Sequence, residues 1–437
     1  MLIRRLELQN FAAFEALELE LDEALTVLVG RNATGKSSIL EALAIALGGF
    51  VSGFRSGKYD HPISPRVVRM AASGLAKFPC RVSAELLVGE RSVRSTRELR
   101  SITGRTTTGE SAELRGLARE MEEQLGSDSR GPLPVVAYYG PGRLWVHKRQ
   151  ARTARQAKGP TRVRKLWASP LRGYEAALDA ASDPKGLGQW LSYREHVWLQ
   201  AYATDPSVSI PRFADVEAVS RAACGCLEAA TDLRYDIRYQ ELRVTFDDGR
   251  VLPFGRLSDG QRNLVALAAD LAWRIMQLNG YLGAAALDQT RGVVLIDEVD
   301  LHLHPAWQWD VLANLRKIFP AVQFVVTTHA GPVISSAPAG TVRLLDGSRV
   351  VDVGSTAGKD INTLLRGLMG TGARPQAVQN ALDELSMLVE DENIYEATRA
   401  ADALAKDLGE DDPTIVAARW ELKFASGEQN EKDQKTQ

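Results

Sequence analysis

The feature that most constrains the fold is a G-x-x-x-x-G-K-S run between an apolar segment and a helical one. The segment before it, Leu25–Val29, is short, apolar and rich in β-branched residues, which predicts a buried strand. From Ser37 to Leu47 apolar residues recur at helical spacing, and Gly48-Gly49 predicts the end of a helix. A strand, a glycine-rich turn and a helix in this order predict backbone N–H groups that surround a phosphate. The residues assigned to nucleotide binding here are Gly30, Arg31, Asn32, Ala33, Thr34, Gly35, Lys36, Ser37 and Ser38.

Two side chains of this phosphate-binding loop are predicted to contact the nucleotide or its metal ion. The spacing places Lys36 to reach the β and γ phosphates of a nucleoside triphosphate. The Ser37 hydroxyl is a ligand for Mg²⁺ in the same pattern. ATP and Mg²⁺ are therefore the predicted cofactors.

A second strand ends in two carboxylates. Val293–Ile296 is the most apolar strand of the sequence, and Asp297 and Glu298 follow it directly. In a parallel sheet this places both acids at the edge where ligands bind. Asp297 would hold Mg²⁺ through its water shell, and Glu298 would orient and deprotonate the attacking water. The alternative is a solvated acidic turn, which the upstream phosphate-binding loop disfavours.

A third motif, L-S-D-G-Q, opens a long helix that runs from Ser258 to about Leu278. A serine hydroxyl, a glycine N–H and a helix N-terminus together form an anion site, so Ser258, Gly260 and Gln261 are assigned to nucleotide binding. Considered alone, the pentad is more often a simple helix cap.

Three histidines follow the acidic strand. Thr328-His329 follows the predicted strand Phe324–Thr327, where the histidine could bond a γ-phosphate, although a lone histidine is more often a surface residue. His302 and His304 alternate in a turn, but no third ligand accompanies them, so a metal site there is disfavoured.

The order of these four motifs resembles the ABC-type ATPase head. In that family ATP lies between two subunits, which implies that Ser258 and Gly260 of one chain grip the γ-phosphate bound to Lys36 of the other. The resemblance places Asp300 at the dimer interface and makes Glu298 and His329 catalytic. Asp259 departs from the commoner glycine, and the turn at 138–143 occupies the approximate place of the family's glutamine-bearing loop.

Two further stretches indicate the branch. Leu8–Phe11 with Phe14, and Asn32 in the loop, resemble the RecF and chromosome-maintenance branch. The runs at 138–143, 257–263, 296–305 and 358–364 are similar to PtuA-type antiphage ATPases of Septu and some retron systems. That resemblance implies an antiviral defence complex in which a nucleotide-gated dimer controls a separate HNH-type nuclease. The alternative is a RecF-like DNA-repair clamp without a nuclease.

The expected fold class is α/β, an ABC-type P-loop NTPase head with inserted helical and loop segments and a C-terminal helical appendage. The head is assigned to residues 1–372, with insertions at about 50–77, 100–130 and 144–230. Residues 373–425 form the helical segment, and residues 426–437 are polar and are expected to be a disordered tail.

Charge is uneven although the net charge is only −2. Arg143–Arg172 is basic, contains Trp145 and Trp167, and suits contact with a nucleic-acid backbone as well as it suits a solvated loop. Residues 381–413 hold eleven acidic and two basic residues at the surface of predicted helices. They describe either an appendage packed on its own head or a docking platform for a basic partner.

The three cysteines, Cys80, Cys224 and Cys226, are too few and too isolated to predict disulfides or a zinc site. No apolar run reaches the roughly 20 residues that span a bilayer. The N-terminus alternates like a strand and lacks the apolar block of a signal peptide. A cytoplasmic protein is expected.

Overall fold

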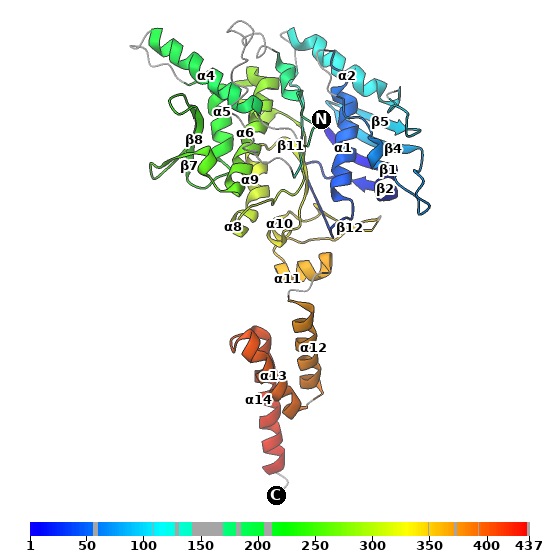
Figure 1. The fold of residues 1–437 in the computed structure, drawn as a ribbon, viewed down its shortest axis with the longest axis vertical. Coiled ribbons are helices and arrows are strands. Elements are labelled where there is room, and N and C mark those ends of the chain that lie inside the picture. The colour runs from blue at the N-terminus through cyan, green and yellow to red at the C-terminus, as the bar shows by residue number, and fades with distance from the viewer. Residues whose placement is uncertain are drawn as a thin grey trace. The chain divides into compact units, whose positions relative to one another are not determined.

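A computed structural model of the chain divides into two compact units, Met1–Ile361 and Asn362–Gln437 (Figure 1). The boundary between head and helical segment was expected between residues 372 and 373. The structure describes residues 1–55, 60–107, 109–126, 131–141, 169–180, 185–204, 212–347, 349–370, 374–391 and 393–434.

The centre of the first unit is a six-stranded sheet in the order β13-β12-β3-β11-β10-β6. All neighbours pair in parallel except β12 and β13. Every residue of β3, β6, β10 and β11 is buried, as expected for strands covered on both faces. The strands are β3 (Leu25–Gly30), β6 (Val135–Tyr139), β10 (Gly292–Ile296), β11 (Val322–Thr327), β12 (Val342–Asp346) and β13 (Arg349–Asp352).

A second, antiparallel sheet has the order β2-β1-β4-β5. Helix α1 (Lys36–Val51) lies between this sheet and the central one, and α2 (Ala112–Glu123) packs against α1 and β5 (Figure 1). The strands are β1 (Leu2–Phe11), β2 (Phe14–Glu20), β4 (Cys80–Val88) and β5 (Arg91–Leu99). The sequence from Phe78 to Leu99 predicts a hairpin around Gly89, and the antiparallel pairing of β4 with β5 confirms it.

A third sheet, β7-β8-β9, lies beside a helical layer in which α5 packs on both α6 and β7. Its strands are β7 (Ala230–Asp236), β8 (Glu241–Phe246) and β9 (Val251–Pro253). The helices are α4 (Lys185–Thr204), α5 (Ala214–Cys224), α6 (Asp259–Asn279) and the short α7 (Ala286–Gln289). Helix α6 is buried over most of its length, so its position is fixed by packing.

Two predicted helix limits are wrong. Helix α1 continues through Gly48 and Gly49 to Val51. These glycines permit close packing, because a Cβ on Gly48 would lie 2.9 Å from Nη1 of the buried Arg97. The sequence from about Ala306 to Phe319 predicts one helix, but the structure has two, α8 (Pro305–Gln308) and α9 (Val311–Ile318), and α10 (Gly331–Ser336) follows β11.

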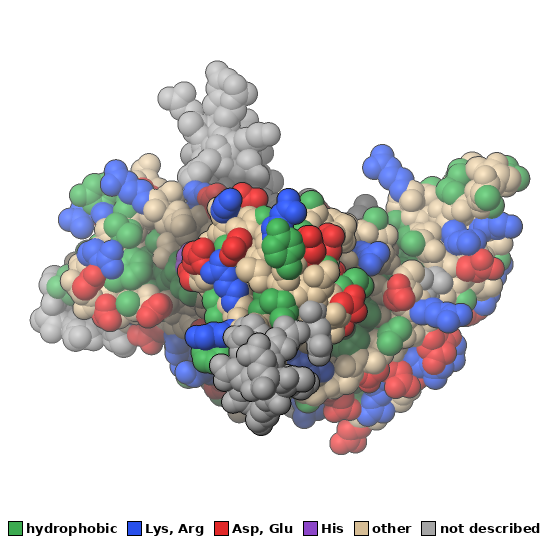
Figure 2. Space-filling model, turned by 90° about the horizontal axis from the view of Figure 1, so that it is seen from below, with side chains coloured by type: hydrophobic (Ala, Val, Ile, Leu, Met, Phe, Trp, Pro, Cys, Tyr) green, Lys and Arg blue, Asp and Glu red, His purple; other side chains and the backbone are tan. Residues whose placement is uncertain are grey.

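The second unit is built from three helices, α12 (Gln376–Glu390), α13 (Ile394–Leu408) and α14 (Pro413–Gln434), after the short α11 (Ile361–Leu364). Its apolar core includes Leu385, Ala401 and Leu422. An ion pair of 2.8 Å between Arg374 and Asp412 joins the residues that precede α12 to those that precede α14. The backbone of α14 remains helical to Gln434, where the sequence analysis expected a disordered tail from residue 426. Figure 2 shows acidic, basic and apolar side chains interspersed on the nearest surface in that view.

Several expectations fall outside the described residues. Most of the basic segment Arg143–Arg172, with Trp145 and Trp167, lies between residues 141 and 169. Within the described ranges, no helix combines the length and apolar character needed to cross a membrane. The described cysteines carry free thiols.

Candidate functional site

The phosphate-binding loop joins β3 to α1. Gly35 has φ 95° and precedes the first residue of α1, and a Cβ there would lie 2.5 Å from Cζ of Phe14. Only glycine fits this position without displacing Phe14. Lys36 Nζ donates to the carbonyl oxygens of Gly30 and Arg31 at 3.0 and 2.8 Å. The lysine therefore folds back over the loop whose N–H groups are predicted to hold phosphate.

Strand order brings the motifs together. Strand β11 lies between β3, which leads into the loop, and β10, which leads into the acidic pair Asp297–Glu298. Because these strands are parallel, their carboxyl ends meet at one edge of the sheet. Burial lowers the pKa of Lys36, and the nearby charges of Asp297 and Glu298 oppose that shift. The lysine and both carboxylates are thus neighbours in space.

Thr327, the last residue of β11, holds the acidic pair. Its hydroxyl donates to Asp297 Oδ1 at 2.5 Å and accepts from the backbone N–H of Glu298 at 2.7 Å. Asp297 is only 2% exposed, and Glu298 has φ 49°. The left-handed backbone at Glu298 is a strained conformation of the kind that clusters at functional sites.

His329 lies in the same group of charges. Burial lowers its pKa first and the Lys36 charge lowers it further, while Asp300, Glu298 and Asp297 act in the opposite direction. One residue earlier, Thr328 donates its hydroxyl to Asp300 Oδ1 at 2.5 Å. Consecutive threonines therefore connect β11 to the acidic pair and to the loop that follows it.

The L-S-D-G-Q motif starts α6 with a reciprocal cap. Ser258 Oγ accepts from Gln261 N at 3.3 Å, and Gln261 Oε1 accepts from Ser258 N at 3.0 Å. Ser258 is exposed, whereas Gly260 is buried against the loop after the acidic pair. A Cβ on Gly260 would lie 2.3 Å from the carbonyl oxygen of His302. The glycine thus permits α6 to touch that loop, and the helix-cap interpretation of the serine is confirmed as one of its roles.

The donor set at the sheet edge fits a magnesium nucleotide. Mg²⁺ in such sites takes one or two protein oxygens together with phosphate oxygens and water. The buried carboxylate of Asp297 and the hydroxyl of Ser37, in the first turn of α1, are the oxygens that this chain offers. Across the described residues there is no cluster of three His, Cys, Asp or Glu side chains suited to an all-protein metal site.

The other two histidines of this region have local contacts. His304 Nδ1 accepts from Ala306 N at 3.3 Å and so caps α8, and its ring lies edge-on to Trp307. His302 adopts φ 60° in the loop that packs on Gly260. These contacts describe a turn at the base of α8.

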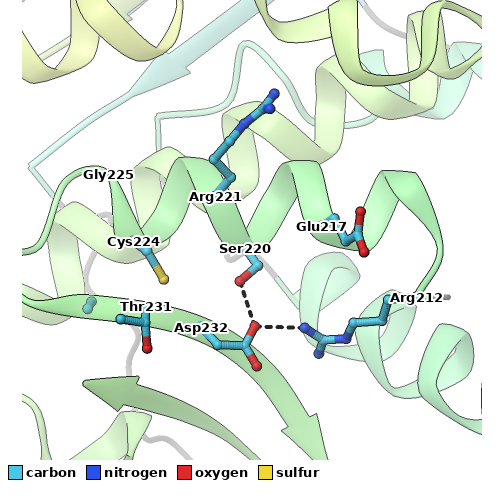
Figure 3. Close-up of a pocket in the computed structure, with 9 residues that line it drawn as sticks. Arg212, Glu217, Ser220, Arg221, Cys224, Gly225, Thr231 and Asp232 are labelled. Carbon is cyan, nitrogen blue, oxygen red and sulfur yellow. Dashed lines mark hydrogen bonds and ion pairs between the residues drawn. The ribbon is translucent and has the colours of Figure 1, made fainter. Parts of the chain in front are cut away.

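An open pocket of about 520 Å³ lies between α5 and β7, away from these motifs in the sequence. Figure 3 shows Ser220 and Arg212 converging on Asp232. Ser220 Oγ and Arg212 Nη1 both donate to Asp232 Oδ1, at 2.9 and 2.7 Å. The Asp232 carboxylate already accepts two hydrogen bonds from within the pocket, so it offers less to a ligand than the sheet edge does.

Some residues at the sheet edge were not identified from the sequence. Thr327 was predicted only as the end of a strand and Thr328 only as the residue before His329, although their two hydroxyls were the available signal. No role at the site was assigned to Tyr138 and Tyr139 from the sequence, although Val135–Tyr139 predicts a buried strand. The structure confirms that strand as β6, next to β10; burial raises the pKa of Tyr138, and the charge of Asp297 adds to that shift.

Family models match two parts of the chain. One, described as "AAA domain", covers residues 5–185. The other, described as "AAA domain, putative AbiEii toxin, Type IV TA system", covers residues 201–336. Together they span the phosphate-binding loop, the signature motif and the acidic pair.

Individual relatives come from bacteria. The chain is 35% identical to the Retron Ec83 probable ATPase of Escherichia coli over 185 residues, which cover 41% of this chain and 34% of that one. It is 23% identical to the Retron Vc95 probable ATPase of Vibrio cholerae over 396 residues, 79% of this chain and 73% of that one. It is 41% identical to the Septu protein PtuA of Bacillus mycoides over 73 residues, 17% of this chain and 9% of that one. The match to the Ec83 protein thus spans about a third of that relative's length.

Among solved structures, an SMC head domain from Thermotoga maritima is similar at a TM-score of 0.45 and 16% identity, covering 81% of this chain and all of that one. The order of motifs along the central sheet, the two family models and the relatives agree. The chain is related to AAA/ABC-type ATPases, among them the retron ATPases and Septu protein PtuA.

Proposed function

We propose that the chain is the ATP-binding and ATP-hydrolysing subunit of an antiphage defence complex. In this proposal it works as a nucleotide-gated head-to-head dimer that controls a separate HNH-type nuclease. One observation carries the proposal: Lys36, Asp297, Glu298 and His329 gather at one sheet edge, while Ser258 is exposed at the start of another element. The relatives in retron and Septu systems support the defence setting.

Each residue then has a role in hydrolysis. The loop N–H groups and Lys36 hold the β and γ phosphates. Ser37 and Asp297 hold Mg²⁺, which supplies charge neutralisation on the phosphate oxygens when it is bound. Glu298 orients the attacking water and accepts its proton, and His329 donates a hydrogen bond to the γ-phosphate.

The second half of the site comes from a second copy of the chain. Ser258, Gly260 and Gln261 lie at the N-terminus of the 21-residue helix α6, whose dipole favours an anion. Asp300 follows the acidic pair and lies in the loop assigned to the interface. Hydrolysis then releases the two copies from each other.

Substitution of Glu298 tests the nucleotide gate. In Glu298→Gln the phosphate contacts remain but no base accepts the proton, so ATP should accumulate in a stable dimer. Mass photometry with and without ATP measures this. The double variant Glu298→Gln/Lys36→Ala is the matched control and should stay monomeric. A Glu298→Gln chain that hydrolyses ATP at the normal rate would remove the residue from the base role.

The proposed binding surface for the nuclease is the exposed face of α14. Val416, Trp420 and Phe424 recur every fourth residue and are 40%, 60% and 67% exposed. The buried Ile415 and Leu422 of the same helix face the core of the unit. Residues 362–437 carry fifteen acidic and eight basic residues, so a partner with a basic, apolar docking helix is complementary.

Co-purification from the native locus tests the partner. We expect a small HNH-type protein in fixed ratio with the tagged chain, and its loss in Trp420→Ser/Phe424→Ser. Tyr395→Ser is the matched control, since Tyr395 is a 75% exposed aromatic on the neighbouring helix α13. Recovery of the ATPase alone would favour the repair-clamp alternative.

Nucleic-acid contact is proposed for the basic segment Arg143–Arg172. Its ten cationic residues would release counterions from a phosphate backbone, so binding should weaken with salt. Neutralising Arg149, Arg152 and Arg155 together should flatten the dependence of the binding constant on salt concentration. If this salt dependence does not change, the three arginines do not contact the nucleic-acid backbone.

A further inference from the structure

Helix α6 is attached to the residues around the acidic pair at two separate places. At its start, Gly260 lies against the carbonyl of His302, and Asn263 Nδ2 donates to the carbonyl of Leu301 at 3.4 Å. Three turns further along, Asp270 and Arg274 reach the end of β6. The helix that carries the signature motif is therefore fixed on both sides of the acidic pair.

The second attachment passes through Tyr139. Its carbonyl accepts from the backbone N–H of Asp297 at 2.8 Å. Its hydroxyl donates to Asp270 Oδ2 at 2.8 Å, and Arg274 Nε donates to the same oxygen at 2.7 Å. Tyr139, Asp270 and Arg274 are 7%, 3% and 5% exposed. One residue thus contacts both the acidic pair and the signature helix, and we call these three residues the buried triad.

The triad is costly to bury. Two ionised groups have left water, and Asp270 Oδ1 has no hydrogen-bond partner. An apolar pair of similar volume would often stabilise a protein as well or better. Arg274 also donates to the carbonyls of Gly173 and Glu175, at 2.9 and 3.1 Å, so its direction is fixed. Such an arrangement specifies a geometry more than it adds stability.

We propose that Tyr139, Asp270 and Arg274 are positioning residues that make α6 and the acidic pair move as one body. Contact of Ser258 with a nucleotide on the partner copy then aligns the chain's own Asp297 and Glu298. This inference rests on the proposed head-to-head dimer and deepens it: the two nucleotide sites of the dimer act cooperatively through this path.

The test is Tyr139→Phe, which removes one hydroxyl and keeps the ring. Tyr174→Phe is the matched control, because Tyr174 is also buried and its hydroxyl donates to the carbonyl of Pro134 at 2.8 Å, outside the triad. We expect Tyr139→Phe to lower kcat on the order of tenfold at unchanged KM, and to bring the Hill coefficient for ATP to one. Tyr174→Phe should keep wild-type kcat and cooperativity. Equal kcat and Hill coefficients in the two variants would overturn the inference.

A second variant separates positioning from stability. Tyr139→Phe/Asp270→Leu/Arg274→Met replaces the ion pair and the hydroxyl that bonds it by apolar groups, so the chain should stay folded while cooperativity is lost. Retained cooperativity in this folded variant would overturn the inference. The Glu298→Gln dimer assay reports the proposed function separately. If Glu298→Gln forms a dimer with ATP and Tyr139→Phe behaves as wild type, the positioning role is wrong and the proposed function stands. If no dimer forms, both the proposed function and the positioning role are wrong.

Discussion

The two helix starts of the first unit that we propose to bind phosphate differ in what surrounds them. At the phosphate-binding loop, Lys36 is 7% exposed and lies beside the acidic pair, which Thr327 holds from the neighbouring strand. At the start of α6, Ser258 is exposed, and its hydroxyl accepts from the backbone N–H of Gln261 in its own helix. One end is enclosed by its own chain and the other is presented outward. This difference is what a site shared between two copies requires.

The largest effect is expected at the enclosed end. Lys36→Ala removes the only cation that contacts the carbonyls of Gly30 and Arg31 among the described hydrogen bonds. ATPase turnover should fall more than about 100-fold, the scale of losing a preorganised charge in an enclosed site. Phosphate release at saturating ATP measures it. Lys77→Ala, at an exposed lysine, is the control and should retain full activity.

Mixing two inactive chains tests whether the presented end serves another copy. Ser258→Asp keeps a cap for α6, because aspartate caps helices as well as serine does, but it places a negative charge where the γ-phosphate is proposed to bind. It should fold normally and hydrolyse no ATP. In a mixed dimer with Lys36→Ala, one of the two sites receives both intact halves, so activity should return.

The controls for this mixture are each variant alone and a mixture of Lys36→Ala with Lys36→Ala/Ser258→Asp, which contains no intact site. Activity restored only in the first mixture supports a shared site. If Ser258→Asp alone retains wild-type turnover, the serine is a helix cap and nothing more.

A smaller effect is expected where Thr327 supports the acidic pair. Thr327→Val keeps the shape and burial of the side chain but removes the hydroxyl that bonds both Asp297 and Glu298. We expect kcat to fall on the order of tenfold with little change in KM, since the acids lose their alignment and nucleotide contacts remain. Thr341→Val is the control, because the buried Thr341 hydroxyl donates only to the carbonyl of Pro338. Equal kcat values in Thr327→Val and Thr341→Val would mean that the Thr327 hydroxyl does not align the acidic pair.

Sequence reasoning succeeded where neighbours along the chain carry the chemistry. The strand before Gly30, the helix after Lys36, the strand before Asp297 and the cap at Ser258 are all local patterns, and the structure contains each. That these motifs meet at one sheet edge could be expected only from the family resemblance, because no local sequence pattern determines the order of strands in a sheet.

Predictions from the sequence were wrong or missing where a residue's role depends on segments far away in the chain. Gly48-Gly49 was interpreted as a stop signal, but the close approach of Arg97, about fifty residues away, accounts for the glycine. The roles of Thr327 and Tyr139 depend on β11 and β6 flanking β10, which only the sheet order reveals. Asp270 and Arg274 look like an ordinary helix-surface pair four residues apart until the burial of α6 is known.

The smallest predicted effect concerns His329. Its pKa lies below the ordinary 6.5, because burial disfavours the charged ring and the Lys36 charge adds to that effect. The ring should therefore be neutral at pH 7 and above, and the stability that this group contributes should be lost as pH falls below 6.5, where the unfolded chain takes up the proton first. Lys36→Met removes one cause while Asp297, Glu298 and Asp300 remain, so the pKa of His329 should rise. Titration of the ring carbons by NMR measures both values, with Lys77→Met as the control. A pKa that does not change in Lys36→Met would mean that the lysine and histidine do not share the enclosed end, and the contrast between the two ends would lose one of its supports.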